Sequence, residues 1–138
     1  MRIVAAFVPV DAFDDQRNIL MATKNGLVKK TVLSAYGNPR STGIIAINLE
    51  EGDRLIEARL TDGQSEVILA TRLGMAIRFP EGKVRPMGRT ATGVNGIKLE
   101  EKDEVVGMVI VRKGVSVLAI CANGYGKRTA VDEYRQTN

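Results

Sequence analysis

Short apolar runs alternate with polar clusters rich in Gly, Asn and acidic residues along the whole chain. No long stretch combines the apolar period of a helix with capping residues. Runs of this length between turn residues are typical of strands, so the pattern predicts an all-β protein. The expected strands are residues 19–23, 27–33, 44–49 and 54–60, then 67–71, 75–79, 94–99 and 104–111, then 115–121 and 125–131, with residues 2–10 as the closing strand of a preceding set.

The chain repeats itself. The segments ATKNGLVKKT, ATRLGMAIRF and ICANGYGKRT align on Gly26, Gly74 and Gly124, which are 48 and 50 residues apart. A second pair, TGIIAINLEEGD and TGVNGIKLEEKD, gives the same period, because Thr42 and Thr92 are 50 residues apart. A period near 50 with four expected strands predicts propeller-like blades.

The aligned glycines mark hairpin turns. Asn25-Gly26 and Asn123-Gly124 each lie between β-rich runs, and Leu73-Gly74 holds the same place in the middle repeat. Asn-Gly favours the positive φ angles of a two-residue type I′ turn, so we expect that turn type here.

We interpret the chain as one repeat-built domain with units at about residues 18–65, 66–114 and 115–138, preceded by the tail of another blade at residues 1–17. It holds about two complete blades of four antiparallel strands and parts of flanking ones. Propellers usually need more blades to close. We therefore expect open strand edges, which favour self-association.

Composition removes several function classes. The chain has no His and one Cys, so His-based catalytic triads, most zinc sites and an intrachain disulfide are excluded. We expect no catalytic residue, metal or cofactor in this chain, and a cytosolic location. Aromatic residues make up 4% and Trp is absent, which argues against single-strand binding by base stacking. The net charge of +4 permits an anionic partner without requiring one.

Basic residues recur with the repeat. Lys30, Arg78 and Arg128 are equivalent by alignment. Lys29 and Lys127 match one step earlier, and the longer links between strands add Arg40, Lys83, Arg85 and Arg89. Equivalent positions on successive blades predict a basic stripe that suits a phosphate backbone and does not read sequence. The alternative is that these charges only keep edge strands soluble.

Two other patterns in the sequence give weaker evidence of a functional site. The acids of LEEGD and LEEKD recur at a turn between strands, which favours a solvated turn over acid–base or metal chemistry. Gly124-Tyr125-Gly126-Lys127 is similar to a phosphate loop, but Cys121 and Arg128 stand where that motif needs Gly and Ser or Thr.

The stretches MATKNGLVKKT, GIIAINLEEGD, VRPMGRTATGVNGIKLEE and NGYGKRTAVDEYR resemble the C-terminal domain of the A subunit of bacterial DNA gyrase over essentially the whole chain. The resemblance implies a β-pinwheel, a propeller-like fold in which neighbouring blades exchange a strand. It implies wrapping of double-stranded DNA around a basic rim, in support of negative supercoiling by a bacterial type II topoisomerase.

The same resemblance implies the partners and the location. These are the rest of the gyrase A polypeptide, the gyrase B polypeptide, and the bacterial cytoplasm beside the nucleoid. ATP and Mg would be used elsewhere in the holoenzyme. The DNA-facing residues that the resemblance indicates are Lys29, Lys30, Arg40, Arg78, Arg85, Arg89, Lys127 and Arg128.

This sequence departs from the family pattern in two ways. It lacks the family's gyrase A box, a Gln-basic-basic-Gly-Gly-basic-Gly heptad that the family needs for wrapping, and it lacks the breakage–reunion domain with its active-site tyrosine. We expect the chain alone to bind DNA weakly and to leave DNA topology unchanged.

Three other interpretations stay open at this point. The C-terminal domain of the topoisomerase IV A polypeptide shares the blade, although its repeats are usually more degenerate. A protein-interaction propeller would bind no nucleic acid, and a Trp-Asp signature typical of one such class is absent. A small enzyme lacks any nucleophile–base pair here.

Overall fold

The computed structural model describes residues 4–112 and 114–134. As expected, the fold is all-β, with short 3-10 turns after the second strand of each hairpin. The elements are β1 (Asn18–Thr23), β2 (Leu27–Val32), η1 (Leu33–Tyr36), β3 (Leu55–Thr61), β4 (Glu66–Thr71), β5 (Ala76–Pro80), η2 (Glu81–Lys83), β6 (Val94–Asn95), β7 (Val105–Val111), β8 (Ser116–Ile120), β9 (Gly126–Ala130) and η3 (Val131–Glu133).

The first sheet has four strands in the order β3-β1-β2-β6, and its last strand comes from the second repeat. Val94 pairs with Val28 and Asn95 with Leu27, and the Gly96 amide donates to the Gly26 carbonyl at 2.8 Å. Neighbouring units therefore exchange a strand, as the resemblance implies. In the first expected set of strands, residues 94–95 take the place of residues 44–49, and the expected strand at residues 94–99 is shortened to the two residues that find a partner.

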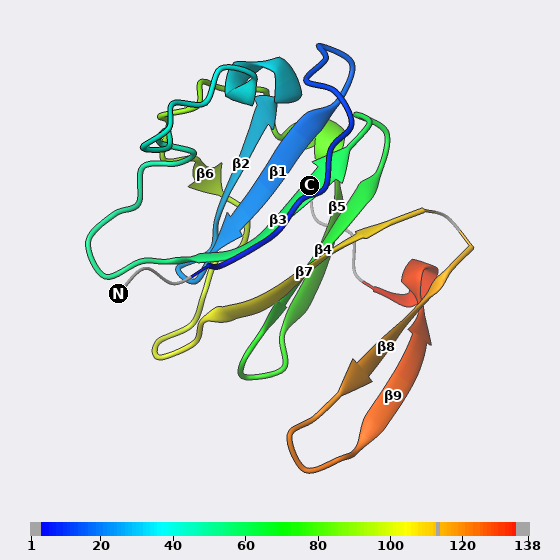
Figure 1. Cartoon of the computed structure of the whole chain (residues 1–138). Coiled ribbons are helices and arrows are strands. Elements are labelled where there is room, and N and C mark those ends of the chain that lie inside the picture. Colours follow the sequence, from blue (N-terminus) through cyan, green and yellow to red (C-terminus); the bar gives the residue numbers. More distant parts are fainter. Residues whose placement is uncertain (1–3, 113, 135–138) are drawn as a thin grey trace.

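The second sheet has three strands in the order β5-β4-β7, and the third has two, β8 and β9. Each hairpin is antiparallel, and β3 and β7 pair with the first strand of the hairpin before them in the sequence. Figure 1 shows the first two sheets packed together and the β8–β9 hairpin projecting from them.

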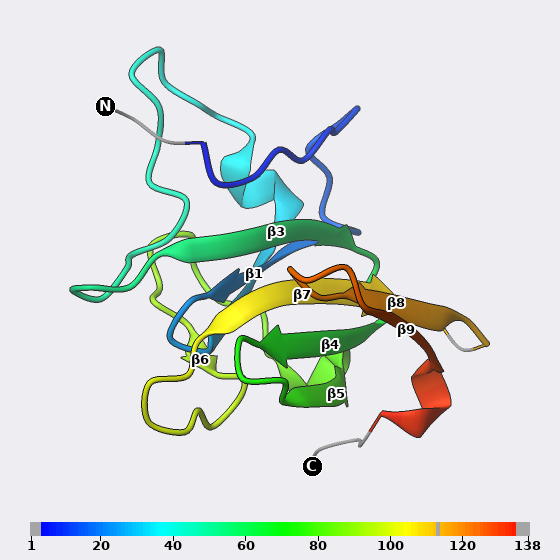
Figure 2. The ribbon, with the colours of Figure 1, turned by 90° about the horizontal axis from the view of Figure 1, so that it is seen from below.

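Two expected strands do not form. Residues 44–49 have no strand partner within residues 4–112 and 114–134, and side chains bind the carbonyls of Ile45 and Ala46 instead. The described part of the 2–10 segment, from residue 4, is also irregular. It runs beside β3 (Figure 2) and its apolar residues pack on the first sheet. Residues 2 and 3 lie outside the described range.

The hairpin turns differ from the expected type I′ turn. Gly26, Gly74 and Gly124 have φ of 90°, 90° and 87°, but the residues before them do not have positive φ. Each glycine amide instead donates to the carbonyl three residues earlier, at 3.0–3.1 Å. This is a three-residue loop that ends in a left-handed residue. The middle repeat forms the same turn with Leu73 because only the glycine needs positive φ.

The recurring aspartates brace these turns. Asp53 Oδ1 accepts from the amides of Asn25 and Arg54, at 2.9 and 2.8 Å. Asp103 Oδ1 accepts from Leu73 and Glu104 in the same way, at 3.0 and 2.8 Å. The acids therefore tie the end of each link to the hairpin turn of its own unit.

Apolar residues fill the space between the sheets. The largest cluster joins Leu20 and Val28 of the first sheet to Val67, Leu69 and Phe79 of the second. A second cluster lies on the outer face of the first sheet, and a smaller third one joins β4 and β7 to η3. The first two units therefore share one core, whereas the third hairpin has little core of its own.

The strand exchange requires a glycine at its entrance. Gly93 has φ of 112°, and a Cβ there would lie 2.6 Å from the Val28 carbonyl oxygen. Gly43, its counterpart in the first repeat, has φ of 88° with nothing within 4 Å of the Cβ position. The two positions share a backbone conformation and differ only in what surrounds them.

We expect Gly93→Ala to destabilise the fold by roughly 2 kcal/mol more than Gly43→Ala. Both variants place a side chain at positive φ, which costs about 1 kcal/mol, but only the first displaces β2. Urea unfolding at low protein concentration measures the difference. Equal losses in the two variants would contradict the close approach.

Lys102 is the described non-glycine residue with positive φ, at 64°, and its counterpart in the first repeat is Gly52. We expect Lys102→Gly to stabilise the fold by up to about 1 kcal/mol, because glycine relieves the strain at some cost in chain entropy. Thermal unfolding would show the gain, with Gly52→Lys as the reciprocal control that loses stability.

Candidate functional site

Lys29 is a buried cation, 1% exposed, and it is held by backbone oxygens of two long links. The first link is residues 37–54, between η1 and β3, and the second is residues 84–104, between η2 and β7, which includes β6. Its Nζ donates to the Ala46 carbonyl at 2.7 Å and also to the Arg89 carbonyl. The Tyr36 hydroxyl donates to the same Ala46 oxygen at 3.0 Å, and Arg89 donates to the Ile45 carbonyl at 2.5 Å. These contacts hold the link of the second unit against that of the first.

Burial lowers the pKa of Lys29 from 10.5 to about 8, and the positive charge of Arg89 adds to the effect. Burial also raises the pKa of the Tyr36 hydroxyl. Both shifts come from the same water-poor joint between the two links. Lys29 is therefore placed to hold the joint rather than to face a partner.

Lys30 and Arg78, which the alignment makes equivalent, lie at successive junctions between units. Lys30 is 5% exposed, and its Nζ donates to the Glu81 carbonyl of η2 at 3.0 Å. Arg78 pairs with Glu66 at 3.0 Å and with Asp132 of η3 at 3.4 Å. In both cases a cation of one sheet reaches the 3-10 turn of the next unit.

Lys29 and Lys30 are buried and Arg78 is half-buried, so these three do not form an exposed stripe in the described structure, and their role in DNA contact stays a prediction. Their recurrence follows from the repeated junction, which needs a long donor at this place on each second hairpin strand. Glu81 is a further junction residue that the sequence analysis missed. Glu81 is fully buried at the position where η1 has Leu33 and η3 has Val131. A carboxylate at a position that is apolar in the other two repeats is the feature of the sequence that could have identified it.

The other basic positions are more accessible. Arg89 is partly buried, with one guanidinium nitrogen bound to Ile45. Four of the expected residues have exposed side chains: Arg40, Arg85, Lys127 and Arg128. A role for these four in DNA contact stays a prediction.

Two of the exposed arginines lie on links that run together. Arg40 belongs to the link after η1 and Arg85 to the link after η2. The Arg89–Ile45 contact and the 3.4 Å hydrogen bond from Asn48 to Ala91 join these links side by side. These contacts join the two links at residues 45–48 and 89–91.

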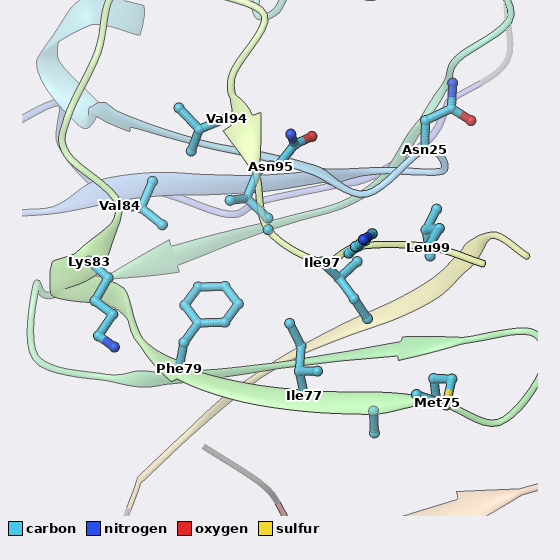
Figure 3. Close-up of a pocket in the computed structure, with 14 residues that line it drawn as sticks. Asn25, Met75, Ile77, Phe79, Lys83, Val84, Val94, Asn95, Ile97 and Leu99 are labelled. Carbon is cyan, nitrogen blue, oxygen red and sulfur yellow. The ribbon is translucent and has the colours of Figure 1, made fainter. Parts of the chain in front are cut away.

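A groove of about 1080 Å³ lies beside β5, between that strand and residues 94–99. Ile77, Phe79, Val84 and Ile97 point into it from opposite sides (Figure 3). Its lining is mixed and its position is that of a sheet edge, since β5 has no neighbour on this side among the described strands. Because Phe79, Val84 and Ile97 belong to the core that the first two sheets share, the groove borders that core on the β5 side.

Within the described ranges, no group of three or more Cys, Asp or Glu side chains is placed to hold a metal ion. No helix in that part of the chain is long and apolar enough to cross a membrane.

Comparison with known proteins agrees with this architecture. Residues 17–62, 65–112 and 116–138 match the family described as the DNA gyrase C-terminal domain, beta-propeller. The chain belongs to this family. Its three matched stretches follow the repeat, and the membership confirms the resemblance found from the sequence.

The family's curated relatives are much longer than this chain. It is 51% identical to the DNA gyrase A protein of Salmonella typhimurium over 95% of this chain and 15% of that protein. It is 50% identical to the gyrase A protein of Chlamydia muridarum, over 98% and 16%, and 47% identical to that of Escherichia coli, over 95% and 15%. The chain therefore spans about one-sixth of the length of these relatives.

Solved structures show the same fold. The C-terminal domain of DNA topoisomerase IV superposes with a TM-score of 0.88 at 32% identity, over 94% of this chain and 41% of that one. The DNA gyrase A C-terminal domain superposes with a TM-score of 0.82 at 27% identity, over 92% and 42%. Both comparisons confirm the β-pinwheel architecture.

The buried Lys29 predicts how stability depends on pH. Between about pH 8 and 10.5 the unfolded chain holds a proton at this lysine that the folded chain has released. The contribution of Lys29 to the free energy of unfolding therefore increases as the pH rises from about 8 to 10.5. Below this range the buried lysine is charged, and the full cost of burying the charge lowers the stability of the fold. Urea unfolding of wild type and Lys29→Met across this range should show a less positive slope in the variant. Identical slopes would mean that Lys29 is not buried as a cation.

Proposed function

We propose that this chain binds double-stranded DNA without reading its sequence, as part of the C-terminal domain of a DNA gyrase A protein. The observation that carries the proposal is identity near 50% to gyrase A proteins along almost the whole chain. The proteins that bear this name act on DNA. Similarity at this level supports the same class of partner here.

The surface supports the proposal on physical grounds. The exposed cations Arg40, Arg85, Lys127 and Arg128 lie on loops and on an edge hairpin, where a wide polyanion can approach them. The net charge of +4 favours that approach. Contacts of this kind neutralise phosphates and position a duplex without reading bases.

In the whole enzyme we propose that this piece supports DNA wrapping and negative supercoiling together with the rest of the gyrase A polypeptide and with the gyrase B polypeptide, in the bacterial cytoplasm at the nucleoid. Strand passage and ATP hydrolysis belong in this proposal to other domains. The chain itself contributes binding surface and no catalytic group.

A topoisomerase IV role is the second candidate, because the C-terminal domain of that enzyme superposes with a TM-score of 0.88. It would share the DNA-binding surface. The 51% identity to a gyrase A protein, against 32% to the topoisomerase IV domain, favours gyrase.

The proposal predicts salt-dependent binding to a long linear duplex. Changing Arg40, Arg85, Lys127 and Arg128 together to Gln should weaken binding, and for each phosphate that is no longer neutralised the slope of log K against log salt should become shallower by about 0.9. Fluorescence anisotropy across a salt series measures both quantities.

The matched control changes four other exposed cations to Gln, namely Arg54, Arg59, Lys98 and Lys102, with the same loss of charge. We expect a smaller loss of affinity in this control. If the slope falls equally in both quadruple variants, binding reflects net charge and the four proposed positions are not a site. If wild type does not bind at low salt, the DNA-binding proposal fails for this chain.

A further inference from the structure

Two cations meet in the joint between the two links without a carboxylate partner. Lys29 Nζ donates to the carbonyls of Ala46 and Arg89, and a guanidinium nitrogen of Arg89 donates to the Ile45 carbonyl at 2.5 Å. Among the described residues, neither cation forms an ion pair with an acid. In that part of the chain, carbonyl oxygens are the groups that offset the two positive charges.

Elsewhere in the core of the fold, a poorly exposed cation has an acidic residue as its partner. Arg78 pairs with the carboxylates of Glu66 and Asp132. Lys30 donates to the carbonyl of Glu81, a residue that brings its own buried carboxylate to the same turn. Burying a charge without a counterion lowers stability. The two cations of the joint are therefore an exception that calls for a negatively charged partner from outside.

The two links are free of acids where they meet. Residues 34–49 and residues 84–99 contain no Asp or Glu, and the acids of each link begin only at Glu50 and Glu100. The cations of these two segments are Arg40, Arg85, Arg89 and Lys98. A surface of this kind attracts an anion and has no carboxylate to repel it.

Arg89 is the cation of the joint that an anion can reach. It is partly exposed and its contact with Ile45 lies at the surface, whereas Lys29 is 1% exposed. A guanidinium carries several N–H donors in a planar fork that fits two phosphate oxygens at once. In the described structure the Ile45 carbonyl engages one of its nitrogens. Arg89 can therefore bind a phosphate while its backbone stays bound to Lys29.

Lys29 responds to the charge at Arg89 although it does not reach the surface. Burial and the positive charge of Arg89 both disfavour the protonated lysine and lower its pKa to about 8. Tyr36 is the other titratable group of the joint; burial raises its pKa, so it stays neutral where Lys29 titrates. An anion bound to Arg89 offsets the guanidinium charge and thereby favours protonated Lys29. By reciprocity, protonated Lys29 favours the bound anion.

We propose that Arg89 binds a backbone phosphate of duplex DNA and that this binding is coupled to the uptake of a proton by Lys29. Lys29 is a positioning residue here, because it holds the Arg89 backbone and does not touch the phosphate. The inference rests on the proposed DNA binding and adds its regulation by pH. Where Lys29 is charged in the free chain, affinity is highest and independent of its titration. At higher pH binding must first restore the proton, so affinity falls.

NMR titration of the wild-type chain with isotope-labelled lysine tests this, with and without a saturating short duplex. We expect Lys29 to titrate near pH 8 in the free chain and at higher pH in the complex. Affinity measured by fluorescence anisotropy over the same pH range should fall about tenfold for each unit by which the pKa rises. A Lys29 pKa that binding leaves unchanged would overturn the proposal, as would a free-chain pKa at the ordinary 10.5.

Three variants assign the effect to the joint. Lys29→Met identifies the Lys29 signal by its loss. Arg89→Gln removes the charge and keeps an amide that can donate to the Ile45 carbonyl; we expect a higher Lys29 pKa before DNA is added and little further rise on binding. Lys98→Gln is the matched control, because it removes an exposed cation of the same link outside the joint, and the rise should match wild type. Equal rises in Arg89→Gln and wild type would overturn the proposal.

Inorganic sulfate separates this inference from the DNA-binding proposal, because it has the tetrahedral oxygens of a phosphate and does not titrate in this range. If the duplex binds and the Lys29 pKa does not move, the proposed function stands and this inference fails. If the duplex does not bind wild type at low salt, the proposed function fails, and sulfate is compared with chloride at equal ionic strength. A higher Lys29 pKa in sulfate then supports an anion site for free anions, and an equal pKa overturns it.

Discussion

The pairing of β6 with β2 is the contact on which the rest of the structure depends. Two residues of the second repeat complete the first sheet, and the link that leads to them passes along β2 closely enough that Gly93 admits no side chain. Through this contact the second unit brings Val84 and Ile97 into the core that it shares with the first. Without it, the first sheet would end at β2 with unsatisfied backbone groups, and the apolar face between the sheets would be open to water.

The same contact explains the buried cations. A link that lies across a sheet presents backbone carbonyls away from any strand ladder, and these need donors. Lys29 donates to one carbonyl of each link, and Lys30 donates to the Glu81 carbonyl of η2, whereas Arg78 pairs with the Asp132 carboxylate of η3. A long basic side chain meets this need because its stem packs on apolar neighbours while its head reaches the oxygen. Recurrence of a basic residue in a repeat protein is thus evidence of a repeated contact, and only burial decides whether that contact is internal.

The sequence was enough to predict the strands that pair locally, the period and the family. Asn25-Gly26 and its counterparts marked the hairpins because turn chemistry is local, although the hydrogen bonds chose a three-residue loop. The fates of residues 44–49 and 94–99 were not predictable from their own apolar pattern, since the two segments are similar and only the second meets a partner strand. The burial of Lys29 could not be predicted for the same reason. Burial of a single side chain depends on where a distant link passes, which no local pattern records.

The strand exchange pairs a segment of one repeat with the hairpin of the repeat before it. This contact therefore does not depend on how many repeats the array contains. Removing or duplicating one whole repeat would bring together a link and a hairpin of the same kinds as those already joined here, without a new interface. Because neighbouring units exchange a strand, gene rearrangement can lengthen or shorten the array by one whole repeat at a time, while each sheet keeps the same structure.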